Sequence, residues 1–287
     1  MSSEQREGAV RTASAAEIDW LLTLAAAEGW NPGLGDAIAF RAADPEGFVV
    51  ALDGGQAVAG ISVVRQDAAH GFLGLYLCAP EARGRGHGWR VWQAGLARLG
   101  ERTVGLDGVV EQQANYRRSG FAFAWRNVRF AGAADVREDT DGALRVRPAA
   151  ADDLAAMVAL DRVVGGVDRE RFLGSWFARV PTRRSFVCER QGRLVGLGTV
   201  RECREHAKIG PLLADGPDAA RALLAALAAH VPGNELVIDV PERNAAAVTL
   251  AREAGLVPVF ETARMYRGTT PRVALGRLYG VATLELG

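Results

Sequence analysis

The residue types best suited to binding a ligand gather in one loop, where residues 84–88 hold three glycines in five positions. The apolar residues 71–79 before the loop predict a strand, and residues 89–99 after it predict a helix. Glycines let successive backbone N–H groups converge on one point without a Cβ in the way, and a helix start adds partial positive charge. The pattern therefore predicts a pyrophosphate cradle, with Arg83 and Arg85 placed for charge-assisted contacts.

Two common phosphate-binding patterns do not fit this loop. A P-loop requires GxxxxGK[ST], which the chain lacks. A dinucleotide-binding fold requires GxGxxG after the first strand of a βαβ unit, whereas these glycines are spaced GxGxG and follow a late strand. The pattern [Q/R]xxGx[G/A] does fit, on Arg83, Gly86 and Gly88.

A second motif, Tyr116-Arg117-Arg118-Ser119-Gly120-Phe121, lies downstream of the loop. With these two motifs and this order of strands, the chain resembles the GNAT acetyltransferases, whose acetyl-CoA loop reads [Q/R]xxGx[G/A] and which carry a YxxxGF segment. It also resembles a bacterial tandem-GNAT subfamily (YitH-like) in residues 105–121, 208–213, 264–268 and 279–280. The resemblance covers nearly all 287 residues. It implies an α/β fold of two GNAT-like units in tandem, each a mixed central β-sheet flanked by helices, and acetyl-CoA as co-substrate.

The resemblance also implies roles for residues of the first unit. The strand backbone at Leu77, Cys78 and Ala79 would pair with the pantetheine arm of acetyl-CoA, and an N–H there would stabilise the tetrahedral oxyanion. Tyr116 would protonate the leaving thiolate as general acid. The pyrophosphate would be held by Arg83, Gly84, Arg85, Gly86, His87, Gly88 and Trp89.

The sequence indicates the general base and the acceptor-binding residues less clearly than the cofactor loop. Asp107 ends the strand beside the expected reaction centre and is the first choice for the base, although a solvated turn residue is an equally simple interpretation. Glu28 and Asp36 flank Trp30 in the region that usually covers the acceptor, and Glu111 follows Asp107 on the loop. We expect Glu28, Trp30, Asp36 and Glu111 to line the substrate site.

The chain repeats itself with a spacing of about 136 residues. GISVVR at residues 60–65 matches GLGTVR at residues 196–201, and His70 and Gly74 match His206 and Gly210. The repeat predicts an N-terminal cofactor-binding domain at residues 1–132, a polar linker at 133–144 and a C-terminal domain at 145–287.

The second unit lacks the residues that would bind a cofactor. Alanine-rich residues 219–224 stand opposite the glycine loop, and Ala251 stands opposite Tyr116. We therefore expect this domain to carry a degenerate loop, to bind no CoA and to help close the acceptor pocket.

The net charge, the cysteine spacing and the N-terminal residues argue against several classes of function. The formal net charge is +0 and the pI about 6.9, which argues against broad binding of nucleic acid or an anionic membrane. The three cysteines show no metal-ligand spacing, so no metal is expected and a reducing compartment is indicated. The polar first ten residues do not resemble a signal peptide. A cytoplasmic protein of bacterial origin, monomeric or homodimeric, is expected.

The sequence thus predicts an N-acetyltransferase that transfers an acetyl group to a primary amine of a small molecule by direct attack. Three alternatives remain open at this point. The first is a non-catalytic acyl-CoA-binding sensor or regulatory protein, the second is an acyltransferase that uses a different acyl donor, and the third is a nucleotide-binding protein of another kind.

Further elements are expected from periodicity and turn signals. They are helices at 15–29, 34–43, 112–119, 152–163, 219–230 and 244–254, and strands at 10–14, 48–52, 58–64, 104–107, 121–130, 185–190, 194–200 and 235–240. The apolar residues 275–286 are expected to form an added strand.

Overall fold

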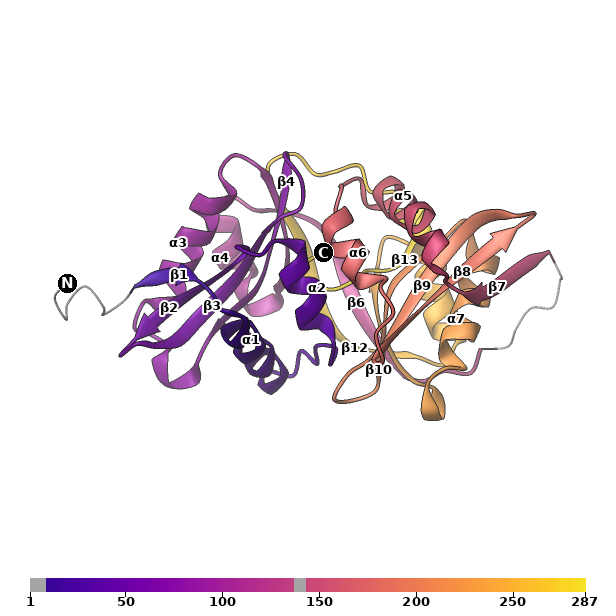
Figure 1. The fold of residues 1–287 in the computed structure, drawn as a ribbon, viewed down its shortest axis with the longest axis horizontal. Helices are drawn as coiled ribbons and strands as arrows, with labels where there is room; N and C mark the ends of the chain where they lie inside the picture. Colours follow the sequence, from indigo (N-terminus) through magenta and orange to yellow (C-terminus); the bar gives the residue numbers. More distant parts are fainter. Residues whose placement is uncertain (1–8, 137–142) are drawn as a thin grey trace.

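A computed structural model describes residues 9–136 and 143–287 of the chain, with one large mixed sheet and helices on its faces (Figure 1). The strands are β1 (Val10–Thr12), β2 (Phe48–Asp53), β3 (Gln56–Arg65), β4 (His70–Cys78), β5 (Thr103–Val109), β6 (Ala122–Ala133), β7 (Leu144–Pro148), β8 (Arg183–Arg190), β9 (Arg193–Glu202), β10 (Ala207–Ala214), β11 (Glu235–Pro241), β12 (Val257–Arg267) and β13 (Leu278–Gly280). The helices are α1 (Ala15–Ala27), α2 (Asp36–Ala43), α3 (His87–Leu99), α4 (Gln113–Arg118), α5 (Leu154–Gly165), α6 (Glu170–Trp176), α7 (Pro217–Ala228) and α8 (Ala245–Glu253).

The helices and strands expected from the sequence are confirmed, with ends that move by a few residues. Helix α1 begins after Ser14, whose side chain accepts from the Glu17 N–H while the Glu17 carboxylate accepts from the Ser14 N–H, a capping box. The sequence pattern predicted none of α6, β7, β10 and β12. Of the expected tail strand, only β13 forms, and the rest of the tail is irregular.

The two halves exchange their closing strands. The strand order is β1-β2-β3-β4-β5-β12-β6-β11-β10-β9-β8-β7, with β13 beside β10. Strand β12, from the second half, thus pairs with β5 of the first half, and β6, from the first half, pairs with β11 of the second. Strands β6 and β12 run antiparallel to each other at the centre of the sheet. One sheet therefore crosses the predicted domain boundary, and neither half completes its own sheet.

Each half contains a pair of parallel strands that separate part-way along. Strands β4 and β5 are paired only from His70 to Leu73, although β4 continues to Cys78. Strands β10 and β11 are paired only from Ala207 to Ile209, although β10 continues to Ala214. Both halves therefore have a V-shaped opening at the same place in the repeat.

The opening of the second half is filled by the chain itself. Strand β13 pairs with β10 beyond the point of separation, with Leu212 opposite Gly280 and Leu213 opposite Leu278. The N–H of Val281 then donates to the Asp239 carbonyl of β11 at 3.0 Å. The tail thus bridges the two separated strands of the second half.

Helices pack on the sheet and between the halves (Figure 1). In the first half, α3 packs its buried face on β2, β3 and β4. Between the halves, α2 meets α6, where Phe40 stacks on Trp176 at 6.4 Å and an interplanar angle of 6°. In the described part of the chain, no helix is long and apolar enough to cross a bilayer. Half of the predicted linker at 133–144 falls on residues 137–142, which lie outside the described residues.

The residues after β13 return to the first half and contact its opening. A Cβ added at Gly74 would lie 2.0 Å from the carbonyl oxygen of Glu285. The hydroxyl of Ser62, the cross-strand partner of Gly74, donates to the same oxygen at 3.3 Å. The tail is therefore held against both halves.

We expect Gly74→Ala to lower the free energy of unfolding by about 1–3 kcal/mol, because the new methyl group overlaps a backbone atom of the tail. Urea denaturation measures the effect. Gly174→Ala is the matched control, since nothing lies within 4 Å of a Cβ at this position in α6 and alanine favours a helix. Equal midpoints for Gly74→Ala and the wild type would contradict a tightly held tail.

Candidate active site

The opening of the first half begins at a bulge in β4. Gly74 lies opposite Ser62, but Leu77 lies opposite Gly60, so Leu75 and Tyr76 together oppose Ile61. Leu75 has φ +43, a left-handed conformation uncommon for a non-glycine residue. Bulges bend a strand and end its regular pairing. This one ends the pairing of β4 with β5 and turns the strand edge toward a cavity.

The cavity has a volume of about 600 Å³, in the range of small-molecule sites. It extends from the glycine loop past the edge of β4 to the second half of the chain. From β4 and the loop it is lined by Leu73, Gly74, Leu75, Tyr76, Leu77, Cys78, Ala82, Arg83, Gly84, Gly86, His87, Gly88 and Trp89. The remaining lining residues are Glu28, Trp30, Leu106, Asp107, Val109, Gln112, Tyr116, Arg129, Phe260, Thr262, Leu284 and Glu285.

The glycine loop has the conformation that an anion cradle requires. Gly84 and Gly86 have φ +76 and +81, and a Cβ at either would meet nothing within 4 Å. Gly86 is the N-cap of α3, so the N–H groups of the first helical turn have no partner within the helix, and the residues of that turn, His87, Gly88 and Trp89, line the cavity. Left-handed residues at a helix start form a concave arrangement of N–H groups that suits a phosphate.

The charged side chains of this loop already have partners. Arg83 pairs with Glu28 and donates from Nε to the Cys78 carbonyl at 3.1 Å. Arg85 pairs with Asp53 at 2.8 Å and does not line the cavity. Burial, with the nearby Arg90, lowers the pKa of His87, so this ring is neutral at pH 7. The backbone, more than the arginines, is therefore free to receive a phosphate.

Tyr116 reaches the cavity from α4. Its ring stacks on Trp92 with centroids 5.3 Å apart, and Phe121 contacts it edge-on. A Cβ at Gly108 would lie 2.7 Å from the Tyr116 ring, so glycine is needed there. Burial raises the pKa of Tyr116 above its usual value, so the phenol keeps its proton at neutral pH. A protonated phenol in the cavity is the state that a general acid requires.

The predicted base, Asp107, has its carboxylate engaged in an ion pair between the two halves. Arg264 of β12 donates to both Asp107 oxygens at 2.8 and 2.7 Å, and Asn127 donates to one of them at 2.8 Å. Burial raises the pKa of Asp107, and the Arg264 guanidinium opposes that shift. With three donors on its two oxygens, the carboxylate is poorly placed to accept a further proton.

The repeat supplies a second reason to treat Asp107 as structural. Arg129 of β6 and Asp239 of β11 form the same bidentate pair in the second half, at 2.7 and 3.0 Å. Arg129 and Arg264 occupy matching positions of the exchanged strands. Because the second half lacks the glycine loop, a pair common to both halves points to strand docking and not to catalysis.

Several other predicted residues are not brought to the cavity. Asp36 is fully buried against Arg201 at 3.2 Å and accepts from the Gly33 N–H. Glu111 is exposed and lies outside the cavity lining. Ala79 also lies outside it, because its N–H donates to the Val58 carbonyl at 2.8 Å. Of the predicted acceptor residues, Glu28 and Trp30 do line the cavity.

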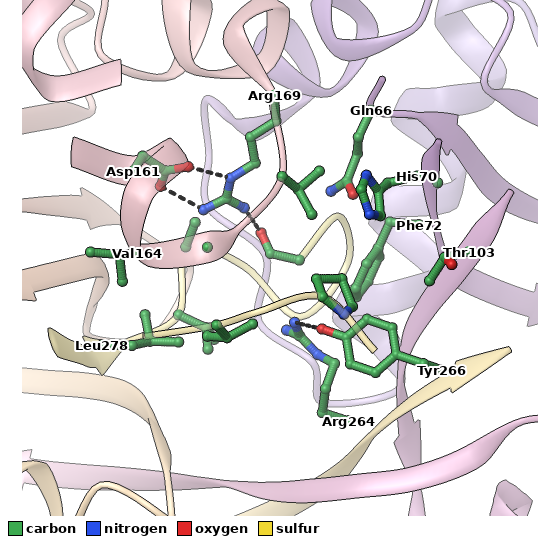
Figure 2. Close-up of a pocket in the computed structure, with 18 of the residues that line it drawn as sticks. Gln66, His70, Phe72, Thr103, Asp161, Val164, Arg169, Arg264, Tyr266 and Leu278 are labelled. Carbon is green, nitrogen blue, oxygen red and sulfur yellow. Dashed lines mark hydrogen bonds and ion pairs between the residues drawn. The ribbon is translucent and has the colours of Figure 1, made fainter. Parts of the chain in front are cut away.

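A smaller cavity of about 60 Å³ is lined by residues of both halves, among them Arg264, the partner of Asp107 (Figure 2). Its polar side chains bind one another: Arg264 donates to the Tyr266 hydroxyl, and Arg169 pairs with Asp161 at 2.7 Å. A space of this size holds water at most. The larger cavity is therefore the candidate active site.

Comparisons with known proteins agree with this geometry. Residues 15–121 match the model of the acetyltransferase (GNAT) family, and residues 157–280 match that of an acetyltransferase (GNAT) domain. A holothin acyltransferase from Pseudoalteromonas sp. (strain SANK 73390) is 32% identical over 265 residues, which is 92% of this chain and 89% of the relative. The chain belongs to the GNAT family. It is a tandem GNAT acyltransferase, as the sequence motifs predicted.

Solved GNAT structures share the whole architecture. A putative acetyltransferase from Pyrococcus horikoshii has a TM-score of 0.81 at 21% identity, with 98% of this chain and 96% of that chain covered. A tandem GNAT protein from the clavulanic acid biosynthesis pathway has a TM-score of 0.63 at 16% identity, with 91% and 98% covered. At these identities the likeness shows the fold alone.

Sequence reasoning missed several cavity residues that lie far along the chain from the glycine loop. Phe260 and Thr262 of β12, Arg129 of β6, and Leu284 and Glu285 of the tail all line the cavity. The strand exchange that brings β12 to β5 leaves no local pattern in the sequence. The one available signal was the match of Arg129 with Arg264 in the repeat.

We expect Asp107→Ala to lower the free energy of unfolding by about 3–5 kcal/mol, because it leaves Arg264 buried without its partner. Urea unfolding followed by tryptophan fluorescence measures this. Glu111→Ala, which removes an exposed carboxylate from the adjoining loop, should change stability by less than about 0.5 kcal/mol. An Asp107→Ala variant that unfolds at the wild-type midpoint would argue against the docking role.

Proposed function

We propose that this protein is an acetyl-CoA-dependent N-acetyltransferase that acetylates a primary amine of a small molecule. The observation that carries the proposal is the contrast between the two openings. In the first half, the opening connects a glycine loop suited to a pyrophosphate with the Tyr116 side chain. In the second half, β13 fills the equivalent space.

The residues of the first half fit the co-substrate along its length. Backbone N–H groups of the loop and of the first turn of α3 would hold the pyrophosphate. The edge of β4 from Leu75 to Leu77 lacks its β5 partner and would pair with the pantetheine arm as a strand does. An N–H on this edge would stabilise the oxyanion of the tetrahedral intermediate.

The reaction is a direct transfer. The neutral amine attacks the thioester carbonyl, a C–N bond forms, and the C–S bond breaks as the intermediate collapses. Tyr116 would give its phenolic proton to the departing sulfur. Cys78 lines the cavity, but burial raises the pKa of its thiol and keeps it protonated, so an acyl-cysteine intermediate is not required.

The walls of the cavity beyond the glycine loop suit a small amine. The acceptor end of the cavity is lined by Trp30, Phe260 and Leu284, an aromatic and apolar surface. The relative named holothin acyltransferase acts, by its name, on holothin. We propose a small-molecule acceptor for this chain, with the protein acting in the cytoplasm. A panel of acyl donors would establish whether acetyl is preferred to longer acyl groups.

Isothermal titration calorimetry with acetyl-CoA tests the cofactor site. We expect one binding event per chain, and for Gly86→Glu an affinity lower by at least about tenfold, because the variant strains a left-handed position by about 1–3 kcal/mol and turns a carboxylate toward the phosphates. Gly216→Glu is the matched control, since Gly216 is the N-cap of α7 with φ +102 in the filled half. Two binding events per chain, or equal effects of the two variants, would contradict a single site in the first half.

Tyr116→Phe tests the general acid. We expect kcat to fall by about 10²–10⁴-fold while the Kd for acetyl-CoA stays at the wild-type value, because only proton transfer to sulfur is lost. Thiol release with dithio-bis-nitrobenzoate measures kcat. Tyr279→Phe, which removes a buried hydroxyl from the second half, serves as the control. Full activity in Tyr116→Phe would assign the proton transfer to another group, and a chain that binds acetyl-CoA but never turns over would be a sensor.

A further inference from the structure

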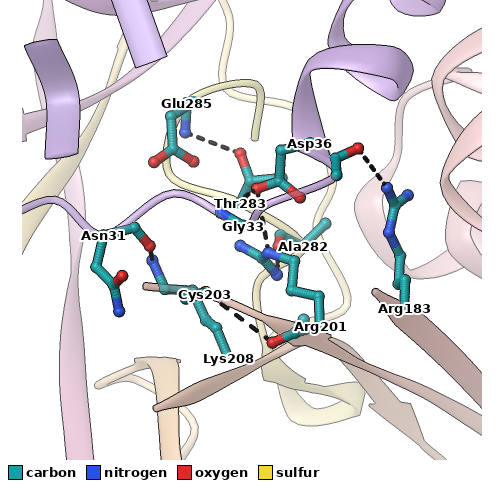
Figure 3. Close-up of polar contacts among 12 residues, drawn as sticks. Asn31, Gly33, Asp36, Arg183, Arg201, Cys203, Lys208, Ala282, Thr283 and Glu285 are labelled. Carbon is teal, nitrogen blue, oxygen red and sulfur yellow. Dashed lines mark hydrogen bonds and ion pairs between the residues drawn. The ribbon is translucent and has the colours of Figure 1, made fainter. Parts of the chain in front are cut away.

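The tail after β13 brings the carboxylate of Glu285 to the cavity of the first half. Figure 3 shows Glu285 beside Thr283 of the same tail. The Thr283 hydroxyl accepts from the N–H groups of Glu285 and Leu286 at 2.9 and 3.0 Å, which forms a tight turn. The carbonyl of Glu285 lies against Gly74 and accepts from Ser62. The backbone of Glu285 is therefore fixed at the β4 bulge, where the opening begins.

The side chain of Glu285 differs from the other buried carboxylates around the site. Glu285 is 4% exposed and lines the cavity, yet its carboxylate makes no hydrogen bond or ion pair with any described residue. In contrast, arginines pair with Asp107, Asp239 and Asp36. In Figure 3 the only dashed line at Glu285 leaves its backbone nitrogen. A buried carboxylate without a partner is costly unless a ligand or water satisfies it.

A second buried polar group in the cavity also lacks a partner. Thr262 of β12 is 2% exposed, its hydroxyl has no hydrogen-bond partner among the described residues, and it lines the cavity. A hydroxyl can donate to one group and accept from another. Thr262 and Glu285 together would offer three acceptor oxygens and one hydroxyl donor to a polar group that enters among apolar walls.

The cations near Glu285 are already committed elsewhere. Arg129 pairs with Asp239 and donates to the Trp30 carbonyl at 3.3 Å. Lys208, which is 2% exposed, donates to the carbonyls of Trp30 and Asn31 at 3.2 and 2.9 Å. The thiol of Cys203 is the other titratable group that Glu285 influences. These contacts fix the Trp30 backbone across the cavity and leave the Glu285 carboxylate available to a ligand.

We propose that Glu285 is the general base of the transfer and that the acceptor is a cationic primary amine on an aromatic or apolar scaffold. The ammonium group would be received by the Glu285 carboxylate and the Thr262 hydroxyl, with the scaffold against Trp30 and Phe260. This inference rests on the proposed function, because it requires that an amine attacks an acyl-CoA in this cavity.

The proton balance of the step is closed. An ammonium carries one proton more than the attacking amine, and Glu285 accepts that proton and becomes a neutral carboxylic acid. The neutral amine attacks, the C–N bond forms, and the C–S bond breaks with a proton supplied by Tyr116. The proton that the amide nitrogen does not keep leaves to solvent, and loss of the Glu285 proton to solvent restores the carboxylate. Solvent returns one proton to the Tyr116 phenolate, so the cycle releases one proton in all.

The test compares Glu285→Gln with the wild type on two kinds of nucleophile. A panel of arylalkyl primary amines, in which the amine is on a saturated carbon and is cationic at neutral pH, requires a base, whereas hydroxylamine is neutral at the same pH and does not. We expect Glu285→Gln to lose about 10²–10⁴-fold in kcat/KM with the best amine of the panel, and to keep the wild-type rate with hydroxylamine. Its rate with the amine should rise toward the wild-type rate as pH is raised through the pKa of the amine, because solution then supplies the neutral form.

Two further variants test whether the effect is specific to the carboxylate of Glu285. Glu261→Gln removes a carboxylate from β12 next to Thr262, where Glu261 pairs with the exposed Arg126, and should leave both rates unchanged. Glu285→Asp keeps the carboxylate one methylene further back and should retain part of the amine activity. Thermal unfolding and acetyl-CoA calorimetry establish that each variant is folded and binds the donor.

The outcomes separate this inference from the proposed function. Equal rates for Glu285→Gln and the wild type with the amine would overturn the base assignment. Equal losses with amine and hydroxylamine, without recovery at high pH, would show that Glu285 only holds the tail in place, and would overturn it as well. A wild-type protein that binds acetyl-CoA but transfers to neither kind of nucleophile would overturn the proposed function itself.

Discussion

The structure depends on the exchange of β6 and β12 at the centre of one continuous sheet. Two equivalent ion pairs, Asp107 with Arg264 and Asp239 with Arg129, fix the exchanged strands, and all four side chains are buried. Buried charges are stable only when paired, so each arginine specifies which strand lies beside it. Because of this exchange, the residues that line the active site come from both halves, and the halves are not independent domains in the physical sense.

The opening between the separated parallel strands is occupied differently in the two halves of this chain. Both halves separate a pair of parallel strands and therefore expose a strand edge that needs a partner. In the second half, β13 provides the partner from within the chain. In the first half, the edge opens into a cavity that leads to a glycine loop. The second opening thus became a fixed anchor for the tail, while the first remained suited to an extended ligand.

Much of the fold could be predicted because its signals are local. Apolar periodicity, the cap at Ser14 and the glycine loop each act within a few residues, and they located most helices and strands and the glycine-loop end of the candidate site. The strand exchange and the path of the tail are set by contacts between distant segments. The assignment of Asp107 as base illustrates the limit: its position on β5 was right, but its partner, Arg264, lies 157 residues away. A pairing at that distance cannot be read from spacing.

The path of the tail also explains why the second half does not need a glycine loop: β13 occupies the opening in which a ligand of that half would bind. Glu285 reaches the β4 bulge only because β13 is anchored between β10 and β11 a few residues earlier. The turn at Thr283 and the contact with Gly74 then orient the residue. A second half that bound its own ligand in that opening would displace β13 and release Glu285 from the cavity. The absence of a glycine loop from the second half and the placement of a carboxylate in the cavity of the first are therefore both consistent with one anchored segment.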